Sequence, residues 1–108
     1  MFEKHIVDGK VAILYSPGSP GFGAGWSTWA YGDSEQAMAM DRDLVLAFLN
    51  GGVDALVKIT EQKYPDNYTG GADDVVVAWL PEGTRFEIRE YDGSETLRTL
   101  DNVPWLVA

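Results

Sequence analysis

The chain has 108 residues, so we expect a single domain spanning residues 1–108. Eight basic and seventeen acidic residues give a formal net charge of −9, which opposes direct binding to duplex nucleic acid because phosphate contacts need Lys and Arg. The sequence contains no cysteine, which excludes disulfides, thiolate catalysis and thiolate metal sites.

Hydropathy gives no indication of a membrane protein. No apolar run approaches the roughly 18 residues that a membrane helix needs, and the N-terminal residues lack the pattern of a signal peptide. We therefore expect a cytoplasmic protein with no membrane partner. The strong acidity has two interpretations, which are solubility alone or a partner with a basic surface.

The first elements form a predicted β-hairpin. Residues 3–7 and 10–15 are strand-like, and Asp8-Gly9 between them suits the type I′ turn that joins two twisted strands. Few positions in residues 10–15 are polar, so the second strand is expected to be central, with both of its faces covered.

A glycine-rich loop follows at residues 16–29 and contains Trp26 and Trp29. Dense glycine indicates positive φ angles, tight turns or the close approach of another group to the backbone. We refer to this segment as the glycine–tryptophan loop.

A helical region is predicted next. Asp33 is a candidate cap with Gln36 three residues later, and the apolar spacing continues to Leu49. Asp41 is a candidate cap for a second helix, which predicts a break near Met40. Gly51-Gly52 ends this region, and a further helix from Asp54 closes at Tyr64-Pro65.

The C-terminal part is strand-like. Residues 75–80 form a continuous apolar run, which predicts the most buried strand. Residues 85–91 alternate with Phe86 and Ile88 facing inward, residues 95–99 form a short edge strand after Asp92-Gly93, and residues 103–107 form a last strand. The predicted fold is therefore α+β, with an antiparallel or mixed β-sheet packed against two or three helices inserted between N- and C-terminal strands.

Two known phosphate-binding motifs are excluded in the glycine–tryptophan loop. The dinucleotide fingerprint needs glycine at its first, third and sixth positions, but the sixth position counted from Gly21 is Trp26 and that counted from Gly23 is Thr28. A Walker P-loop is excluded because no Gly-Lys-Ser/Thr follows the glycines.

Two interpretations of this loop remain. Exposed N–H groups, hydroxyls and aromatic rings could bind a phosphate and stack on a base, together with two later loops that also contain glycine, hydroxyl and aromatic residues. Alternatively, the two tryptophans fill the core and the glycines let the chain pass over them. The candidate ligand-binding residues are Gly21, Phe22, Gly23, Gly25, Trp26, Ser27, Thr28, Trp29, Thr69, Gly70, Tyr91 and Ser94.

No catalytic or metal-binding constellation accompanies the loop. His5 is the only histidine and lies in the N-terminal strand, and no acidic pair has the spacing of a calcium loop. We therefore expect a protein that is not an enzyme, with no cofactor and no metal. The acidic residues that could bind a basic partner are Asp41, Asp43, Asp73, Asp74, Glu87 and Glu90.

Four motifs together resemble a family of small proteins encoded by tailed bacteriophages and prophages. They are residues 19–29 (SPGFGAGWSTW), 68–71 (YTGG), 79–84 (WLPEGT) and 90–95 (EYDGSE). The chain differs from that pattern by its additional Ser16-Pro17-Gly18 and a longer N-terminal hairpin. The resemblance implies a phage setting, in the cytoplasm of an infected bacterial cell, and brings no catalytic residues.

This setting suggests an accessory protein that blunts host defence, by analogy. One hypothesis is a protein that sequesters a small nucleotide-like signal in the glycine–tryptophan loop. A second is an acidic inhibitor, of the anti-CRISPR or nuclease-inhibitor type, that occupies a basic groove of a host defence protein. A third is a phage accessory protein of unrelated function, and homodimerisation through exposed strand edges is left open.

Overall fold

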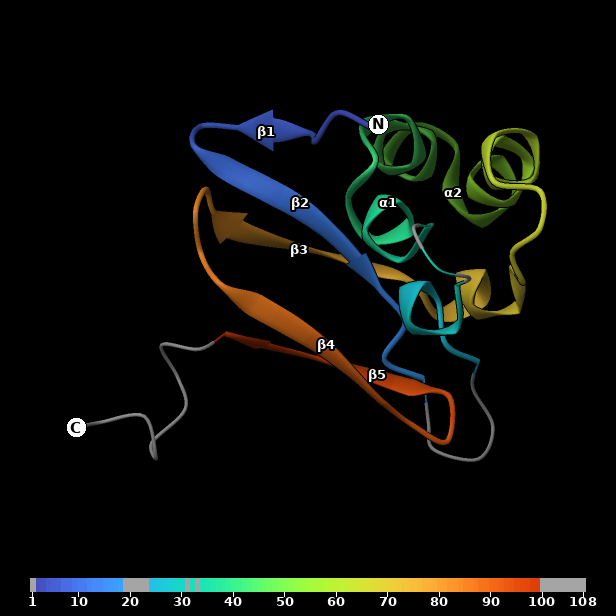
Figure 1. Ribbon diagram of the computed structural model, residues 1–108. Coiled ribbons are helices and arrows are strands. Elements are labelled where there is room, and N and C mark those ends of the chain that lie inside the picture. The colour runs from blue at the N-terminus through green and yellow to red at the C-terminus, as the bar shows by residue number, and fades with distance from the viewer. Residues whose placement is uncertain (1, 19–23, 31, 33, 100–108) are drawn as a thin grey trace.

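The structure is a computed structural model that describes residues 2–18, 24–30, 32 and 34–99. It confirms the predicted α+β fold: the helical segment lies between the N- and C-terminal strands in the sequence, and in space the three-stranded antiparallel sheet lies between the helices and a two-stranded antiparallel hairpin (Figure 1). The elements in chain order are β1 Ile6–Val7, β2 Lys10–Tyr15, η1 Ser27–Trp29, α1 Ser34–Met40, α2 Arg42–Lys63, η2 Gly70–Asp74, β3 Val76–Pro81, β4 Phe86–Tyr91 and β5 Ser94–Thr99, where η marks a 3-10 helix.

The N-terminal hairpin is present as predicted, although β1 is shorter than expected. Asp8 and Gly9 have φ angles of 52° and 76°, the positive values that a type I′ turn needs at both central positions. The turn sets an antiparallel register that pairs Ile6 with Val11 and Val7 with Lys10. The conformation of this turn is determined by its two central residues, so it could be predicted from the sequence.

Strand β2 is the centre of the fold. It lies between β1 and β3, and both of its faces are covered, as predicted. Ala12 and Leu14 pack with the helices in the main core cluster. Val11 and Ile13, on the other face, belong to a second cluster that contacts the β4–β5 hairpin. Figure 1 shows this hairpin and α2 on opposite sides of β2.

Strand β3 corrects one prediction. It is an edge strand rather than the most buried one, because in the described residues it pairs only with β2, through a register from Lys10 opposite Pro81 to Tyr15 opposite Val76. Val76 and Trp79 are accordingly exposed. An apolar run indicates a strand, but it does not show how many neighbours that strand has.

The helical region breaks where the sequence predicted. Helix α1 ends at Met40, and the Asp41 side chain caps α2 by accepting a hydrogen bond from the backbone N–H of Asp43 at 2.9 Å. Gly52, with φ 75° and ψ −158°, interrupts α2, and the helix ends at Lys63. Among the described residues, no helix is long and apolar enough to cross a membrane. The predicted cap Asp33 and the predicted strand at 103–107 lie outside the described residues.

The C-terminal hairpin also follows the prediction. Asp92 and Gly93 have φ angles of 49° and 86°, and the antiparallel register runs from Phe86 opposite Thr99 to Tyr91 opposite Ser94. Phe86 and Ile88 pack against the second core cluster, as the alternation predicted. The hairpin thereby brings the start of β5 beside the end of β2.

Candidate functional site

The carboxylate of Glu95 on β5 binds the glycine–tryptophan loop from inside the protein. Its Oε1 accepts a hydrogen bond from the backbone N–H of Ser16 at 2.8 Å, and its Oε2 accepts from the backbone N–H groups of Trp26 at 2.7 Å and Thr28 at 3.0 Å. The Thr28 hydroxyl donates to the same Oε2. Glu95 is 1% exposed, so its carboxylate is buried and these donors satisfy both of its oxygen atoms.

The loop therefore does present donors to an anion, but the anion is a side chain of the same protein. This arrangement contradicts the assignment of the Thr28 donors to the phosphate of a ligand, because both of them already bind Glu95. The importance of Glu95 was missed from the sequence. A glutamate in a short polar strand is expected to face solvent, and nothing in the local pattern indicates burial.

Trp26 is a core residue and not a ligand-stacking residue. It is 0% exposed, and its indole Nε1–H donates to the backbone carbonyl of Met38 at 2.6 Å. It packs in the main core cluster with Leu44 and Leu56. Its assignment to a stacking role is wrong because no face of the ring is open, and the alternative interpretation, that it fills the core, holds for this residue. Ser27 beside it is buried as well.

The glycines in two of the loops serve close packing. A Cβ atom on Gly71 would lie 2.3 Å from the carbonyl oxygen of Gly25, so the two backbones are in direct contact. A Cβ atom on Gly25 would meet the Trp29 ring at 2.4 Å, and one on Gly70 would meet the Tyr68 hydroxyl at 2.2 Å. The structure thus brings together the glycine–tryptophan loop and the loop at residues 68–71, as the sequence suggested.

These contacts place two aromatic rings side by side on the surface. The Trp29 and Tyr68 ring centroids are 5.7 Å apart with an interplanar angle of 31°, and the residues are 40% and 56% exposed. Such a distance is typical of an attractive aromatic pair. Trp29 was predicted as a site residue, whereas Tyr68 was missed, although it directly precedes the predicted Thr69 and Gly70.

The remaining ligand-site candidates lie in the two later loops, and both of these loops contact the glycine–tryptophan loop, one through Gly71 and the other through Glu95. Thr69 precedes the 3-10 helix η2, while Tyr91 and Ser94 pair with each other at the turn of the β4–β5 hairpin, where Tyr91 is 71% exposed. The predicted residues Gly21, Phe22 and Gly23 lie outside the described residues.

The acidic partner-site candidates differ in accessibility. Asp43, Asp73, Asp74, Glu87 and Glu90 are exposed, whereas Asp41 is 1% exposed. Asp41 therefore cannot contact a partner, and its assignment to a partner surface is corrected. Glu87 binds the Arg89 Nε at 2.9 Å, and Glu90 accepts a hydrogen bond from the backbone N–H of Gly93 at 2.7 Å.

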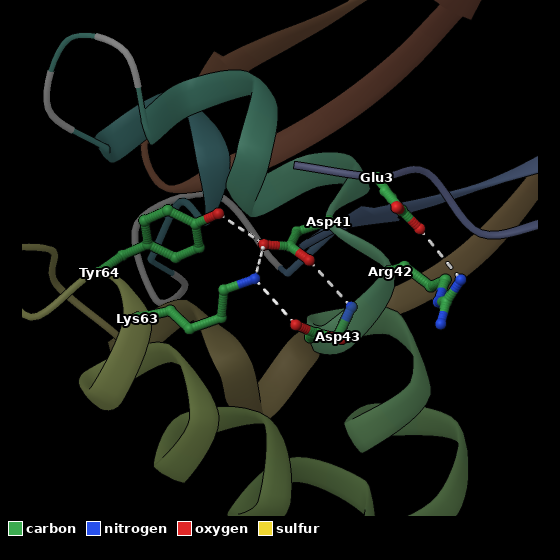
Figure 2. Close-up of polar contacts among 6 residues, drawn as sticks. All are labelled: Glu3, Asp41, Arg42, Asp43, Lys63 and Tyr64. Carbon is green, nitrogen blue, oxygen red and sulfur yellow. Dashed lines mark hydrogen bonds and ion pairs between the residues drawn. The ribbon is translucent and has the colours of Figure 1, made fainter. Parts of the chain in front are cut away.

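Asp41 is instead the centre of a polar cluster that joins the two ends of α2 (Figure 2). Its Oδ2 accepts hydrogen bonds from the Lys63 Nζ at 2.7 Å and from the Tyr64 hydroxyl. The Lys63 Nζ also binds Asp43 at 2.9 Å. Because Asp41 and Asp43 lie at the start of α2 and Lys63 and Tyr64 at its end, these contacts hold the two halves of the broken helix against each other.

The ionisation of this cluster follows from its contacts. Burial alone would raise the pKa of Asp41, but the hydrogen bonds from Lys63, Tyr64 and the backbone of Asp43 outweigh it and hold that pKa below its usual 3.8. Burial and the hydrogen bond to Asp41 raise the pKa of Tyr64 to about 12. Burial alone would lower the pKa of Lys63, yet its contacts with both aspartates raise it. The cluster is therefore charged and internally satisfied at neutral pH, which indicates a structural role.

A cleft of about 530 Å³ lies between α1 and β4. Its lining combines apolar, uncharged polar and acidic residues: Ser27, Glu35, Gln36, Ala39, Met40, Phe86, Glu87 and Ile88. This volume lies in the range of ligand pockets in proteins. Within the part of the chain that the structure describes, no group of three or more His, Cys, Asp or Glu residues could hold a metal ion.

Comparisons of the chain with protein-family models, with curated proteins and with solved structures gave no match. The functional inference consequently depends on the chemistry of the exposed residues described above.

Proposed function

We propose that this protein is a non-enzymatic inhibitor that binds a basic surface of another protein. Its docking surface is centred on the exposed Trp29–Tyr68 ring pair and includes Asp73 and Asp74 in the adjoining helix η2; we call these four residues the aromatic–acidic face. The observation that carries the proposal is the exposure of two contacting aromatic rings, one of which, Tyr68, lies two residues before the helix η2 that contains the exposed Asp73 and Asp74, on a chain with a net charge of −9.

The chemistry of this face suits Arg and Lys side chains. Tryptophan and tyrosine are enriched among the residues that dominate protein–protein binding energy. Their ring faces attract guanidinium and ammonium groups, and neighbouring carboxylates such as those of Asp73 and Asp74 add charge-assisted hydrogen bonds. The overall negative charge would also speed the encounter with a positively charged partner.

The phage resemblance of the sequence supplies the biological setting of the proposal. A protein that blunts bacterial defence can act on the basic groove in which a nuclease or CRISPR effector binds nucleic acid. An acidic face that occupies such a groove competes with the nucleic acid for the same cations. The partner class that we infer is therefore a host defence protein with a basic groove.

Sequestration of a nucleotide-like signal is the second candidate. The exposed rings of Trp29 and Tyr68 favour it, since aromatic side chains stack on bases without sequence preference. It ranks second because one of the two candidate stacking residues, Trp26, is buried, and because the Thr28 donors that were expected to bind the phosphate bind Glu95.

Calorimetric titration of purified CRISPR effectors and defence nucleases with this protein tests the first proposal. We expect one-to-one binding to an effector with a basic groove, weakened at least about tenfold between ~50 mM and ~200 mM salt. Trp29→Ala should weaken this binding about 30-fold, the effect of losing an interface residue worth about 2 kcal/mol.

Glu82→Gln is the matched control for charge. Glu82 is exposed and directly follows the C-terminal end of β3, whereas η2 precedes the N-terminal end of that strand at Val76. Replacement of Glu82 should therefore leave the affinity unchanged. Equal loss of affinity in Asp73→Asn, Asp74→Asn and Glu82→Gln would mean that only the net charge matters.

Native mass spectrometry with cyclic oligonucleotides tests the second candidate, which predicts a one-to-one complex that Trp29→Ala abolishes.

A further inference from the structure

The cleft between α1 and β4 has two chemically different walls. Helix α1 contributes the buried Ala39 and Met40, and β4 contributes the half-buried Phe86 and Ile88. These apolar side chains also belong to or pack against the second core cluster, so the wall that they form is held by the core. The first turn of α1 adds the exposed polar residues Glu35 and Gln36.

The rim of the cleft that α1 forms is negatively charged. Among the described residues, the Glu35 carboxylate forms no ion pair. Glu87, on the β4 side, pairs with Arg89 on the same strand, and this pair is exposed to solvent, which makes it weak and open to competition. An occupant that complements the cleft therefore has an apolar stem and a cationic head group.

We propose that this cleft binds an arginine side chain of the partner protein. This inference rests on the proposed function, because it assigns a second contact point to the same basic partner. The aliphatic part of arginine suits Ala39 and Met40, and its planar guanidinium can stack on Phe86 while donating to Glu35 and to the side-chain carbonyl of Gln36. Arginine is favoured over lysine because the lysine ammonium is more strongly hydrated and cannot stack as a plane.

The position of the cleft supports its assignment to the same partner. The 3-10 helix η1 spans Ser27–Trp29, and its first residue lines the cleft while its last residue belongs to the aromatic–acidic face. The same short helix packs against both α1 and β4. A basic segment of a partner that covers Trp29 would thus reach the mouth of the cleft.

Methyl NMR of the protein with ¹³C-labelled methionine methyl groups tests the inference without the partner protein. The probes are the capped peptides Ala-Arg-Ala, Ala-Lys-Ala and Ala-norleucine-Ala. Met40 lines the cleft and reports its occupancy, whereas Met38 is fully buried in the main core and serves as an internal reference. We expect the arginine peptide to shift the Met40 resonance in a saturable manner and to leave Met38 unchanged.

Charge specificity is tested with two variants. Glu35→Gln should weaken arginine-peptide binding about threefold to fivefold, the loss of one partly exposed ion pair, while the matched control Glu61→Gln, at an exposed position of α2, should not change it. Equal binding of the arginine and norleucine peptides, no effect of Glu35→Gln, or no Met40 shift would overturn the inference. Equal binding of the lysine and arginine peptides would overturn the preference for arginine.

The two proposals can fail separately. A cleft that binds the arginine peptide in a protein that binds no basic defence protein would contradict the proposed function alone. Tight binding of an effector that depends on Trp29 but not on Glu35, together with no peptide binding, would contradict the cleft inference alone.

Discussion

The Glu95 carboxylate accepts a hydrogen bond from the backbone N–H of Trp26 at 2.7 Å across 69 residues of sequence. This contact ties the C-terminal hairpin to the loop that precedes α1, and the Glu95 backbone N–H strengthens it by donating to the Ser16 carbonyl at 2.8 Å. The hydrogen bonds fix the backbone around Trp26 while the Trp26 ring fills the core, so polar and apolar contacts act at the same point of the chain.

Replacement of Glu95 by glutamine should therefore destabilise the fold. The variant keeps the shape of the side chain but replaces one acceptor oxygen by an amide NH₂, which faces N–H donors where an acceptor is needed. We expect the free energy of unfolding to fall by about 1–3 kcal/mol, the cost of an unsatisfied buried group. Urea denaturation measures this change, and Glu82→Gln, at an exposed turn, should stay within about 0.5 kcal/mol of the parent protein.

The elements that the sequence predicted correctly are determined by local chemistry. The Asp8-Gly9 turn, the cap contact between Asp41 and Asp43 and the break at Gly52 involve residues close together in the sequence, and all three appear at the expected positions. The edge position of β3 depends on which strands pair, and the burial of Glu95 depends on donors far away in the sequence. Such long-range relationships leave no periodic pattern in one sequence.

The same distinction between local and long-range relationships applies to the candidate site. Composition and spacing indicated that aromatic residues and glycines gather in the glycine–tryptophan loop, but not which tryptophan is buried. The structure separates Trp26, in the core, from Trp29, on the surface beside Tyr68. Tyr68 carries no distinguishing signal of its own, because its contact with Trp29 joins two loops that are far apart in the sequence and meet at Gly25 and Gly71.

Substitution by phenylalanine should affect stability much more at Trp26 than at Trp29. Trp26→Phe removes the donor to the Met38 carbonyl and leaves a void in the core, so we expect a loss of about 2–4 kcal/mol in unfolding free energy. Trp29→Phe should change it by less than about 1 kcal/mol because the ring is partly exposed. Acrylamide should also quench the fluorescence of the Trp26→Phe variant more fully than that of Trp29→Phe, and the reverse order would contradict the burial of Trp26.

Gly71 and Gly70 provide a matched test of loop contact. Alanine at position 71 meets the backbone carbonyl of Gly25, which cannot rotate away, so Gly71→Ala should cost about 1–3 kcal/mol of stability. The atoms nearest to an alanine Cβ at position 70 belong to the far end of the exposed Tyr68 side chain, which can move. We therefore expect Gly70→Ala to be nearly neutral in thermal unfolding while it weakens any binding that depends on the Trp29–Tyr68 pair. Equal melting temperatures for the two variants would contradict the backbone contact.

The Asp41 cluster should make stability depend on pH at both ends of the range. The pKa of Asp41 is depressed in the folded protein, so its stabilising contribution is present above about pH 4 and is lost as the pH falls through the folded value. The pKa values of Lys63 and Tyr64 are raised, so their contributions are present below their ordinary values of 10.5 and 10.0 and are lost as the pH rises further. The cluster should therefore stabilise the fold most between these limits.

Asp41→Asn isolates this effect. At pH 7 the free energy of unfolding of the variant should be about 1–3 kcal/mol lower than that of the parent protein, because Lys63 and Tyr64 lose a buried charged partner. The difference between the two proteins should shrink as the pH falls below about 4, where the parent protein also loses the charge of Asp41. Urea denaturation at a series of pH values measures both curves. A difference that stayed constant from pH 7 to about pH 2 would show that the ionised form of Asp41 adds nothing to stability, contrary to the contacts in Figure 2.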